Sequence, residues 1–256
     1  MLPTQDGKHT QYYENTTNKF REFIIYNGEL VGPFLQYNRN GLLLILAHFN
    51  EGRLDGDYLE YYDDQDTSLK KISGSFNNDL PYKKFETYYI SGNLCTITNF
   101  DKNGKKHGDV YEFYDENLTC VKLHLNYNHG EKHGKIIRYY RDGKLDVTAN
   151  YENGYLNGEY TKYFPTGIIR IQCYWRKGKL DGKYIMNYPN GNPLRIIFFK
   201  EGLLNGRAHF MHKDCTIKTT CDFVDGKLSG EYKNFDTNGI IIKYYIDNKL
   251  LSAPEV

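Results

Sequence analysis

The sequence predicts an all-β protein, an elongated and twisted antiparallel β-meander built from about nine to ten β-hairpin repeats of 24 residues. Three observations lead to this fold class. The chain has 25 tyrosines, 14 phenylalanines and only four alanines. This composition favours strands, because aromatic residues suit a pleated, half-buried surface and alanine is the best helix former. Glycines recur at a fixed period, and turn signals alternate with short runs of tyrosine, isoleucine and phenylalanine.

Each repeat is defined by a glycine that we call the marker. From residue 130 onward the markers lie 24 residues apart, whereas the earlier ones are less regular. The marker positions are Gly28, Gly52, Asp79, Gly104, Gly130, Gly154, Gly178, Gly202 and Gly226. A second glycine stands four residues after every marker except Asp79, where the marker glycine itself is lost. An aromatic residue usually stands three residues before the marker. The chain is therefore a tandem repeat.

Two turn signals, separated by strand-like runs of about 5–8 residues, divide each repeat. The first is a Gly-x-Leu-x-Gly segment such as 178–182, whose glycines can take positive φ and whose leucine can pack under the turn. The second lies thirteen residues after the marker, in pairs such as Asn190-Gly191 and Asn238-Gly239. We expect type I′ turns at these pairs, since both central residues of that turn need positive φ. One repeat is thus one hairpin, and roughly 20 strands result.

The ends of the chain resemble incomplete repeats. We divide the sequence into an N-terminal partial or capping repeat at residues 1–25, a repeat array at 26–246, and a C-terminal partial repeat with a tail at 247–256. Atypical terminal repeats commonly shield open edge strands. Longer spacings at 63–73 and 116–125 predict insertions in two hairpin loops.

Charge and hydropathy exclude several classes of function. The net charge is +1, from 33 basic and 32 acidic residues, which argues against a nucleic-acid binder that neutralises phosphates. The longest apolar run, Leu42 to Ala47, is far shorter than the ~20 residues of a membrane-spanning helix. The N-terminus shows no apolar segment of a secretory signal. Five cysteines without close pairing suggest reduced thiols. We expect an intracellular, cytoplasmic protein.

The pattern Tyr-x-x-Gly-x-Leu-x-Gly-x-Tyr-x-x-Tyr resembles the MORN repeat, and the Lys-x-His-Gly or Lys-Leu-x-Gly turns resemble its variant form most closely. The resemblance covers about residues 7–251. The departures from the pattern are Asp79 for the marker glycine, Cys215 for a hairpin glycine, and Lys106 and Lys132 for the leucine. These departures affect single turns rather than the repeat as a whole.

The resemblance implies an extended antiparallel sheet and a non-catalytic scaffold that mediates protein–protein interaction or assembly. If the source is a large DNA virus, it implies a structural component of a particle and a location in the virion. Two alternatives stay open. A peripheral membrane-lipid module would need a face rich in lysine and arginine, yet Arg176 and Lys177 alternate with acids such as Asp181. An antitoxin-like protein would neutralise a partner toxin.

Chemistry-bearing residues show no catalytic, cofactor-binding or metal-binding pattern. His9, His107 and His133 occupy equivalent turn positions about 10 Å apart in a linear array, too far for one metal ion, and we expect them to stabilise turns. His209, His212 and Cys215 are the nearest approach to a metal cluster, but their spacing divides them between faces. We expect Cys173 and Cys221 to be small buried hydrophobes.

Tyrosines are the remaining candidates for binding. Aromatics three apart on a strand point to opposite faces, so that one can fill the core while the other presents a stripe to a protein partner. The stripe is predicted at Tyr58, Tyr61, Tyr160, Tyr163, Tyr184 and Tyr188. The alternative is that both faces pack within the coiled sheet.

Overall fold

The computed structural model describes residues 5–63, 69–115, 120–237 and 239–251. The described residues form 24 β-strands and no helix, so the all-β prediction is confirmed. Asn238 lies outside the described residues, as do parts of the predicted insertions, of the first partial repeat and of the tail. The chain divides into two compact units, residues 1–131 (unit 1) and 132–256 (unit 2), each described by itself.

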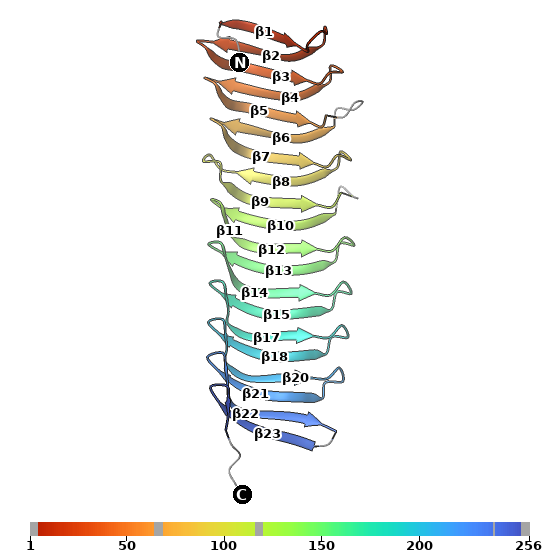
Figure 1. The fold of residues 1–256 in the computed structure, drawn as a ribbon, viewed down its shortest axis with the longest axis vertical. Helices are drawn as coiled ribbons and strands as arrows, with labels where there is room; N and C mark the ends of the chain where they lie inside the picture. Colours follow the sequence, from red (N-terminus) through yellow and green to blue (C-terminus); the bar gives the residue numbers. More distant parts are fainter. Residues whose placement is uncertain (1–4, 64–68, 116–119, 238, 252–256) are drawn as a thin grey trace. The chain divides into compact units, whose positions relative to one another are not determined.

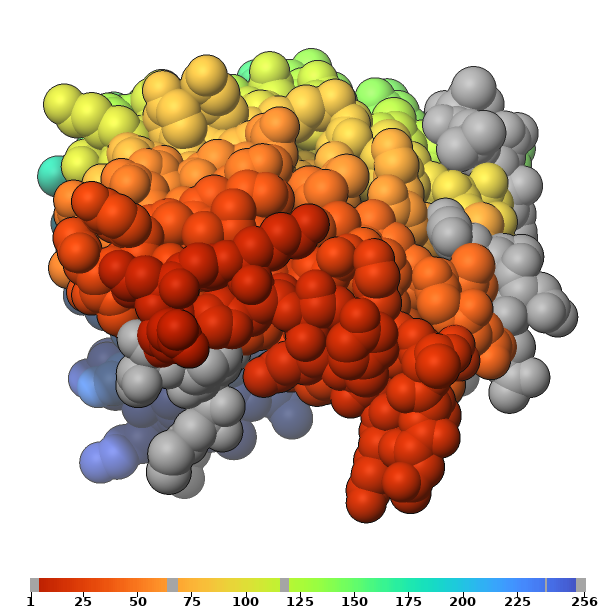
Figure 2. Space-filling view, turned by 90° about the horizontal axis from the view of Figure 1, so that it is seen from above, coloured from red at the N-terminus to blue at the C-terminus, as the bar shows by residue number. Residues whose placement is uncertain are grey.

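Unit 1 is an antiparallel meander in which each strand pairs with the next along the chain (Figure 1). Its strands are β1 (Gly7–Tyr12), β2 (Lys19–Tyr26), β3 (Glu29–Tyr37), β4 (Leu43–Asn50), β5 (Arg53–Tyr61), β6 (Lys70–Asn77), β7 (Leu80–Tyr88), β8 (Leu94–Phe100), β9 (Lys106–Phe113) and β10 (Val121–Asn128). Figure 2 looks onto the end of this unit, where the N-terminal strands lie nearest the viewer.

Unit 2 continues the same hairpin logic. Its strands are β12 (Gly134–Tyr139), β13 (Leu145–Glu152), β14 (Tyr155–Tyr163), β15 (Ile169–Arg176), β16 (Lys179–Leu180), β17 (Gly182–Asn187), β18 (Pro193–Lys200), β19 (Leu203–Leu204), β20 (Gly206–Met211), β21 (Ile217–Val224), β22 (Lys227–Asp236), β23 (Gly239–Ile246) and β24 (Lys249–Leu250); β11 (Glu131–Lys132) spans the sequence boundary of the units. Short strands such as β16 and β17 are two pieces of one predicted strand. Both pair with β15, and the second glycine of the repeat begins the second piece.

The type I′ turns lie at the markers other than Gly104, and not at the pairs thirteen residues after the markers. Asn27 and Gly28 have φ of 50° and 78°, as this turn requires. At the Asn-Gly pair ending in Gly191, only the glycine has positive φ. The loop there is longer, since Tyr188 donates its N–H to the carbonyl of Asn192 (2.8 Å) and Gly191 donates to that of Tyr188 (2.9 Å). The predicted turn type at these pairs is therefore wrong, because Asn-Gly also suits a type I turn followed by a left-handed glycine.

A backbone hydrogen bond from the marker to the preceding repeat joins most successive hairpins; Gly104 is an exception, since it donates to Asp101 within its own loop (3.1 Å). Gly178 donates its N–H to the carbonyl of Leu156 (2.8 Å), the central leucine of the preceding Gly-x-Leu-x-Gly segment. Asp79, which replaces a marker glycine, keeps positive φ (65°) and donates to Leu54 (2.9 Å), and its carboxylate accepts the Leu54 N–H in return (2.8 Å). The added side-chain bond explains how this turn tolerates the loss of glycine.

Cys215 occupies a hairpin position that is glycine in most repeats, with φ of 70°. A side chain at this positive φ lowers the folded state's stability by roughly 1–2 kcal/mol. Glycine avoids this strain, but its greater conformational freedom in the unfolded chain offsets part of the gain. We therefore expect Cys215→Gly to raise the free energy of unfolding by about 0.5–1 kcal/mol, measured by urea denaturation. Cys215→Ser keeps the Cβ atom and serves as the control. An equal gain in both variants would contradict the explanation by backbone strain.

The core is a row of side chains on one face, in which large and small residues alternate from strand to strand. In unit 1, Phe34 lies opposite Ala47, Ala47 opposite Tyr58, and Tyr58 opposite Gly74. In unit 2, Ala149 lies opposite Tyr160. Further pairs of the unit 2 row are Ile136 with Ala149, Tyr160 with Cys173, and Tyr184 with Ile197, whereas Ala208 with Cys221 brings two small residues together. Because each hairpin adds only one layer, its row is buried by the rows of its neighbours.

Candidate interaction surfaces

Reactive side chains stay dispersed over the part of the chain that the structure describes. Within it, no three histidine, cysteine, aspartate or glutamate side chains gather to hold a metal ion. His209 lies on β20 opposite Thr220, whereas His212 and Cys215 lie in the loop that follows. Cys173 is buried, and burial raises the pKa of its thiol to about 11. Cys221 is buried too, with its pKa raised to about 11 for the same reason. Such thiols are poor nucleophiles. No helix in the described ranges has the length and apolar character to span a bilayer.

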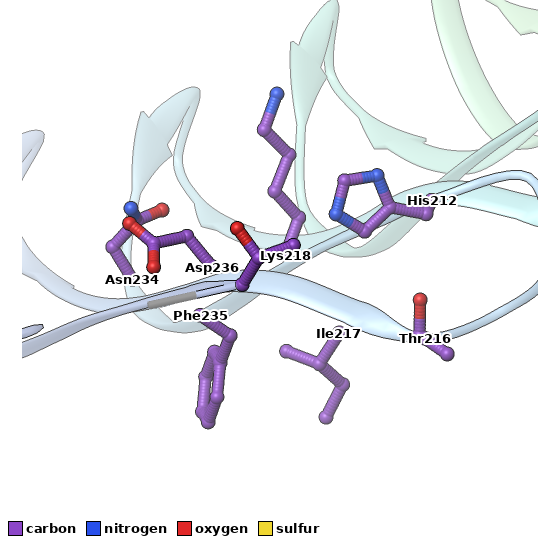
Figure 3. A pocket seen from close by; sticks show the side chains of 8 residues that line it. His212, Thr216, Ile217, Lys218, Asn234, Phe235 and Asp236 are labelled. Carbon is purple, nitrogen blue, oxygen red and sulfur yellow. The ribbon is translucent and has the colours of Figure 1, made fainter. Parts of the chain in front are cut away.

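The hollow in Figure 3 lies beside the loop after β20, with a volume of about 470 Å³. Lys218 and Asn234 extend to one side of the strands, and Ile217 and Phe235 to the other. The hollow is open, and its polar lining comes from loop and strand-end residues rather than from a converging set. We assign no chemistry to it.

The six tyrosines of the predicted stripe are all half-buried. Tyr58, Tyr160 and Tyr184 lie in the core row described above. Tyr184 packs against the buried cluster of Ile197, Ala208 and Cys221. These three tyrosines therefore contribute to the core, and their role in binding a partner stays a prediction.

Tyr61, Tyr163 and Tyr188 lie at the hairpin ends, where tyrosines link repeats. Tyr188 donates its hydroxyl to the carbonyl of Met211 (2.9 Å), and the carbonyl of Tyr163 accepts the hydroxyl of Tyr140 (2.8 Å). The same bond recurs in unit 1, from Tyr13 to Tyr37, Tyr62 to Tyr88 and Tyr89 to Phe113. Some of the tyrosines thus form a ladder of hydrogen bonds between repeats, which the sequence pattern did not predict. The 23- to 26-residue separation between the bonded positions could have indicated it.

Stability should fall at alkaline pH because of these half-buried tyrosines. Burial, with Glu60 nearby, raises the pKa of Tyr58 from 10.0 to about 12, and burial with a hydrogen bond to Glu86 does the same for Tyr88. Since the folded-state pKa is the higher one, their contribution is fully present below pH 10 and is lost as the pH rises to about 12. Urea denaturation across this range measures the loss. The double variant Tyr58→Phe/Tyr88→Phe should show a shallower decline, and an unchanged decline would refute the assignment.

Unit 2 exposes a second set of apolar side chains, which we call the aromatic edge: Tyr155, Tyr174, Phe198 and Leu203. Tyr155 and Leu203 directly follow marker glycines, and both are more than half exposed (62% and 51%). Tyr174 and Phe198 lie on β15 and β18, on the face opposite the core row, since their neighbours Cys173 and Ile197 are buried. Four exposed apolar side chains therefore recur over successive repeats.

Charged side chains of both signs border the aromatic edge. Two hollows of about 510 and 400 Å³ share Lys177; Tyr155 and Glu152 line the first, and Arg176, Lys179, Asp181 and Glu201 line the second. Arg176 pairs with Asp181 (2.8 Å), so part of the positive charge is compensated. Aromatic and arginine side chains are enriched where protein interfaces concentrate their binding energy.

The net charge differs between the units, although the whole chain is nearly neutral. Residues 1–131 carry 13 lysines and arginines against 19 acids, a net charge of −6, whereas residues 132–256 carry 20 against 13, a net charge of +7. The net charge of the whole chain hides this difference, whereas the net charge of each half of the sequence reveals it.

Comparison with known proteins identifies the repeat. The family model described as MORN repeat variant matches residues 132–153, 156–177 and 180–201. No curated protein matches the chain. The crystal structure of TcdB2-TccC3 aligns with 95% of this chain at 10% identity, with a TM-score of 0.22, and that of TcdB2-TccC3-Cdc42 with 94% at 11%, with a TM-score of 0.21. The chain spans only 14% and 16% of the length of those chains, and no conclusion rests on the alignments.

The repeat geometry is not confined to the matched segment. In unit 1, the marker Gly52 donates to the carbonyl of Leu30 (2.9 Å), as Gly178 does to Leu156 in unit 2. The hairpins of both units therefore follow one plan. This chain carries MORN repeats of the variant type, three of them in direct succession over residues 132–201.

Proposed function

We propose that the chain is a non-enzymatic scaffold inside the cell that binds another protein through the aromatic edge of unit 2. The observation that carries this proposal is the exposure of Tyr155, Tyr174, Phe198 and Leu203 on successive repeats. Exposed apolar side chains repeated on successive hairpins are candidates for an interaction site. The bordering cations and acids favour a partner with charged groups of both signs around an apolar centre.

An anionic membrane is the second candidate, favoured by the net charge of +7 on unit 2. However, several of its arginines are already paired, as in Arg138 with Asp146 (2.6 Å) and Arg207 with Asp222 (2.9 Å). Such pairs reduce the charge available to lipid headgroups. We therefore favour a protein partner.

Photo-crosslinking from single positions tests the proposal. A benzoylphenylalanine at Tyr174 should give a discrete adduct with a protein in extracts of the source cells. The same group at Tyr26, an even more exposed tyrosine at the end of β2 in unit 1 (62% against 43%), is the control. The adduct should disappear when Phe198→Glu is added, because a charge there is incompatible with an apolar interface.

Two results would overturn the proposal. One is equal crosslinking from Tyr174 and Tyr26, which would show that no particular surface is used. The other is sedimentation of the chain with anionic vesicles at low salt that Phe198→Glu leaves intact, together with no protein adduct, which would favour the membrane instead.

A further inference from the structure

Two small residues face each other at one point of the unit 2 core row. Earlier in the row a tyrosine fills the space between small residues, as Tyr160 does between Ala149 and Cys173. At β20 and β21, Ala208 lies opposite Cys221 instead, and both are buried (1% and 4% exposed). The row therefore lacks a ring at this point.

A hollow of about 490 Å³ opens beside this pair, with Cys221 in its lining. Its aromatic walls are Phe210, Phe223 and Tyr232, which also pack against the buried cluster that contains Ala208 and Cys221. The volume falls in the range of sites for small molecules, which combine a mainly apolar lining with a few polar groups. The other lining residues are Tyr188, Leu194, Met211, Lys218, Thr219 and Leu228.

Contacts outside the hollow hold its walls in place. The ring of Tyr232 packs edge-on against that of Tyr245, with 6.1 Å between the centroids and 70° between the planes. Tyr188 donates its hydroxyl to the carbonyl of Met211 (2.9 Å). Because these rings are anchored elsewhere, they are held back from filling the space themselves. The hollow is therefore formed before a ligand binds, which lowers the entropic cost of binding.

One side of the hollow carries a positive charge. Of the described residues that line it, Lys218 alone is charged, and it forms no ion pair within the described ranges. Lys218 extends to the same side of the strands as Asn234 (Figure 3). That side is the one with the hollow, since Thr219 of its lining donates its hydroxyl to Asn234 (3.1 Å). An unpaired ammonium group beside an apolar hollow attracts a carboxylate.

We infer that this hollow binds an aromatic carboxylate, whose ring lies beside Cys221 where the core row lacks a tyrosine and whose carboxylate pairs with Lys218. The walls Phe210, Phe223 and Tyr232 favour a ring, because aromatic pairs gain from edge-to-face packing beyond their buried area.

The spacing of the two groups sets the length of the ligand. Lys218 precedes Cys221 by three residues on β21, about 10 Å along an extended strand. The lysine side chain spans part of this distance, so a carboxylate about two or three bonds from the ring fits. Free arylalkyl acids and the C-terminal aromatic residue of a peptide share this chemistry.

The inferred site is separate from the aromatic edge. Cys221 and Phe223 lie on the face of the core row, whereas Tyr174 and Phe198 lie on the opposite face. A ligand in the hollow and a protein on the aromatic edge would therefore bind to different faces of unit 2. Phe198→Glu should leave ligand binding unchanged, so the inference and the proposed function can fail independently.

Titration of the full chain with 3-phenylpropionate, followed by calorimetry and by amide NMR shifts, tests the inference. For a ligand of this size a Kd of about 0.1–1 mM is expected, with shifts concentrated on β20 to β22. Lys218→Glu should weaken binding about tenfold, because it replaces an attraction by a repulsion. The matched control is Lys183→Glu, which makes the same change of charge at an exposed lysine opposite Phe198 and should alter the Kd less than about twofold.

Two further arms separate the ring from the charge and one source from the other. The neutral 3-phenylpropanamide should bind about fivefold more weakly than the acid, and equally to the natural chain and to Lys218→Glu. Cys221→Leu, which fills the hollow, should abolish binding of both; if circular dichroism shows that it loses its strands, the lysine variants still decide. Tighter binding of N-acetylphenylalanine than of 3-phenylpropionate would assign the site to the end of a peptide, and the reverse order to a free acid.

Either of two outcomes would overturn the inference. One is the absence of heat and of shifts with the acid up to roughly 10 mM. The other is an affinity for 3-phenylpropionate that Lys218→Glu leaves unchanged, which would show that the carboxylate is not recognised at this hollow.

Discussion

Replacing Phe23 by alanine is expected to lower the free energy of unfolding of unit 1 by about 3–5 kcal/mol. The Phe23 side chain is 1% exposed, and its ring stacks between His9 (5.5 Å between centroids) and Phe34 (6.2 Å). Removing it deletes buried apolar contacts and leaves a cavity that the neighbouring strands cannot close without losing their register. Urea denaturation gives the change, and hydrogen exchange of the β1 to β3 amides shows where it acts.

The matched control is Tyr26→Ala on the same strand, at a side chain that is 62% exposed. A change within about 0.5 kcal/mol is expected there. If the two variants were equally stable, the row of alternating side chains would not be the core of the repeat.

Gly74→Ala should destabilise the same unit by about 1–3 kcal/mol, although alanine is common in this row. A Cβ atom at Gly74 would lie 2.7 Å from the ring of Phe85. That ring cannot move aside, since it is held between Phe76 (5.2 Å) and Phe100 (5.4 Å). The added methyl group therefore strains the packing of three aromatic rings.

A second substitution separates this packing effect from any effect on the backbone. Phe85→Leu makes room for the methyl group, so the double variant Gly74→Ala/Phe85→Leu should lose less stability than the sum of the two single changes. Additive losses in the denaturation curves would mean that the clash between Gly74 and Phe85 is not the cause.

Much of the fold could be predicted because its determinants are local. The marker glycines, 24 residues apart from residue 130 onward, and the strand-like runs between the turn signals correctly predict where each hairpin lies in the sequence. The turn type was less accessible. Asn-Gly satisfies two loop geometries, and at Gly191 the hydrogen bonds of Tyr188 with Asn192 and Gly191 close the longer loop.

The tyrosines show how little of the binding surface can be predicted from the sequence. Spacing alone assigns Tyr58 and Tyr61 to opposite faces, but it does not say which tyrosine is covered by the next repeat. Tyr58 packs edge-to-face on Phe76 (5.5 Å), and Tyr188 bonds to a carbonyl 23 residues away, contacts that exist only after the repeats stack. The exposed residues Tyr174 and Phe198 carry no different signal in the sequence.

By itself, the sequence determined the strand content, the period and the positions of the turns, because glycine spacing and side-chain alternation act within a few residues. The tertiary structure alone decided which tyrosines lie in the core row and how Asp79 replaces a glycine. These features depend on contacts between residues 20 or more positions apart, and such contacts arise only when one hairpin packs on the next.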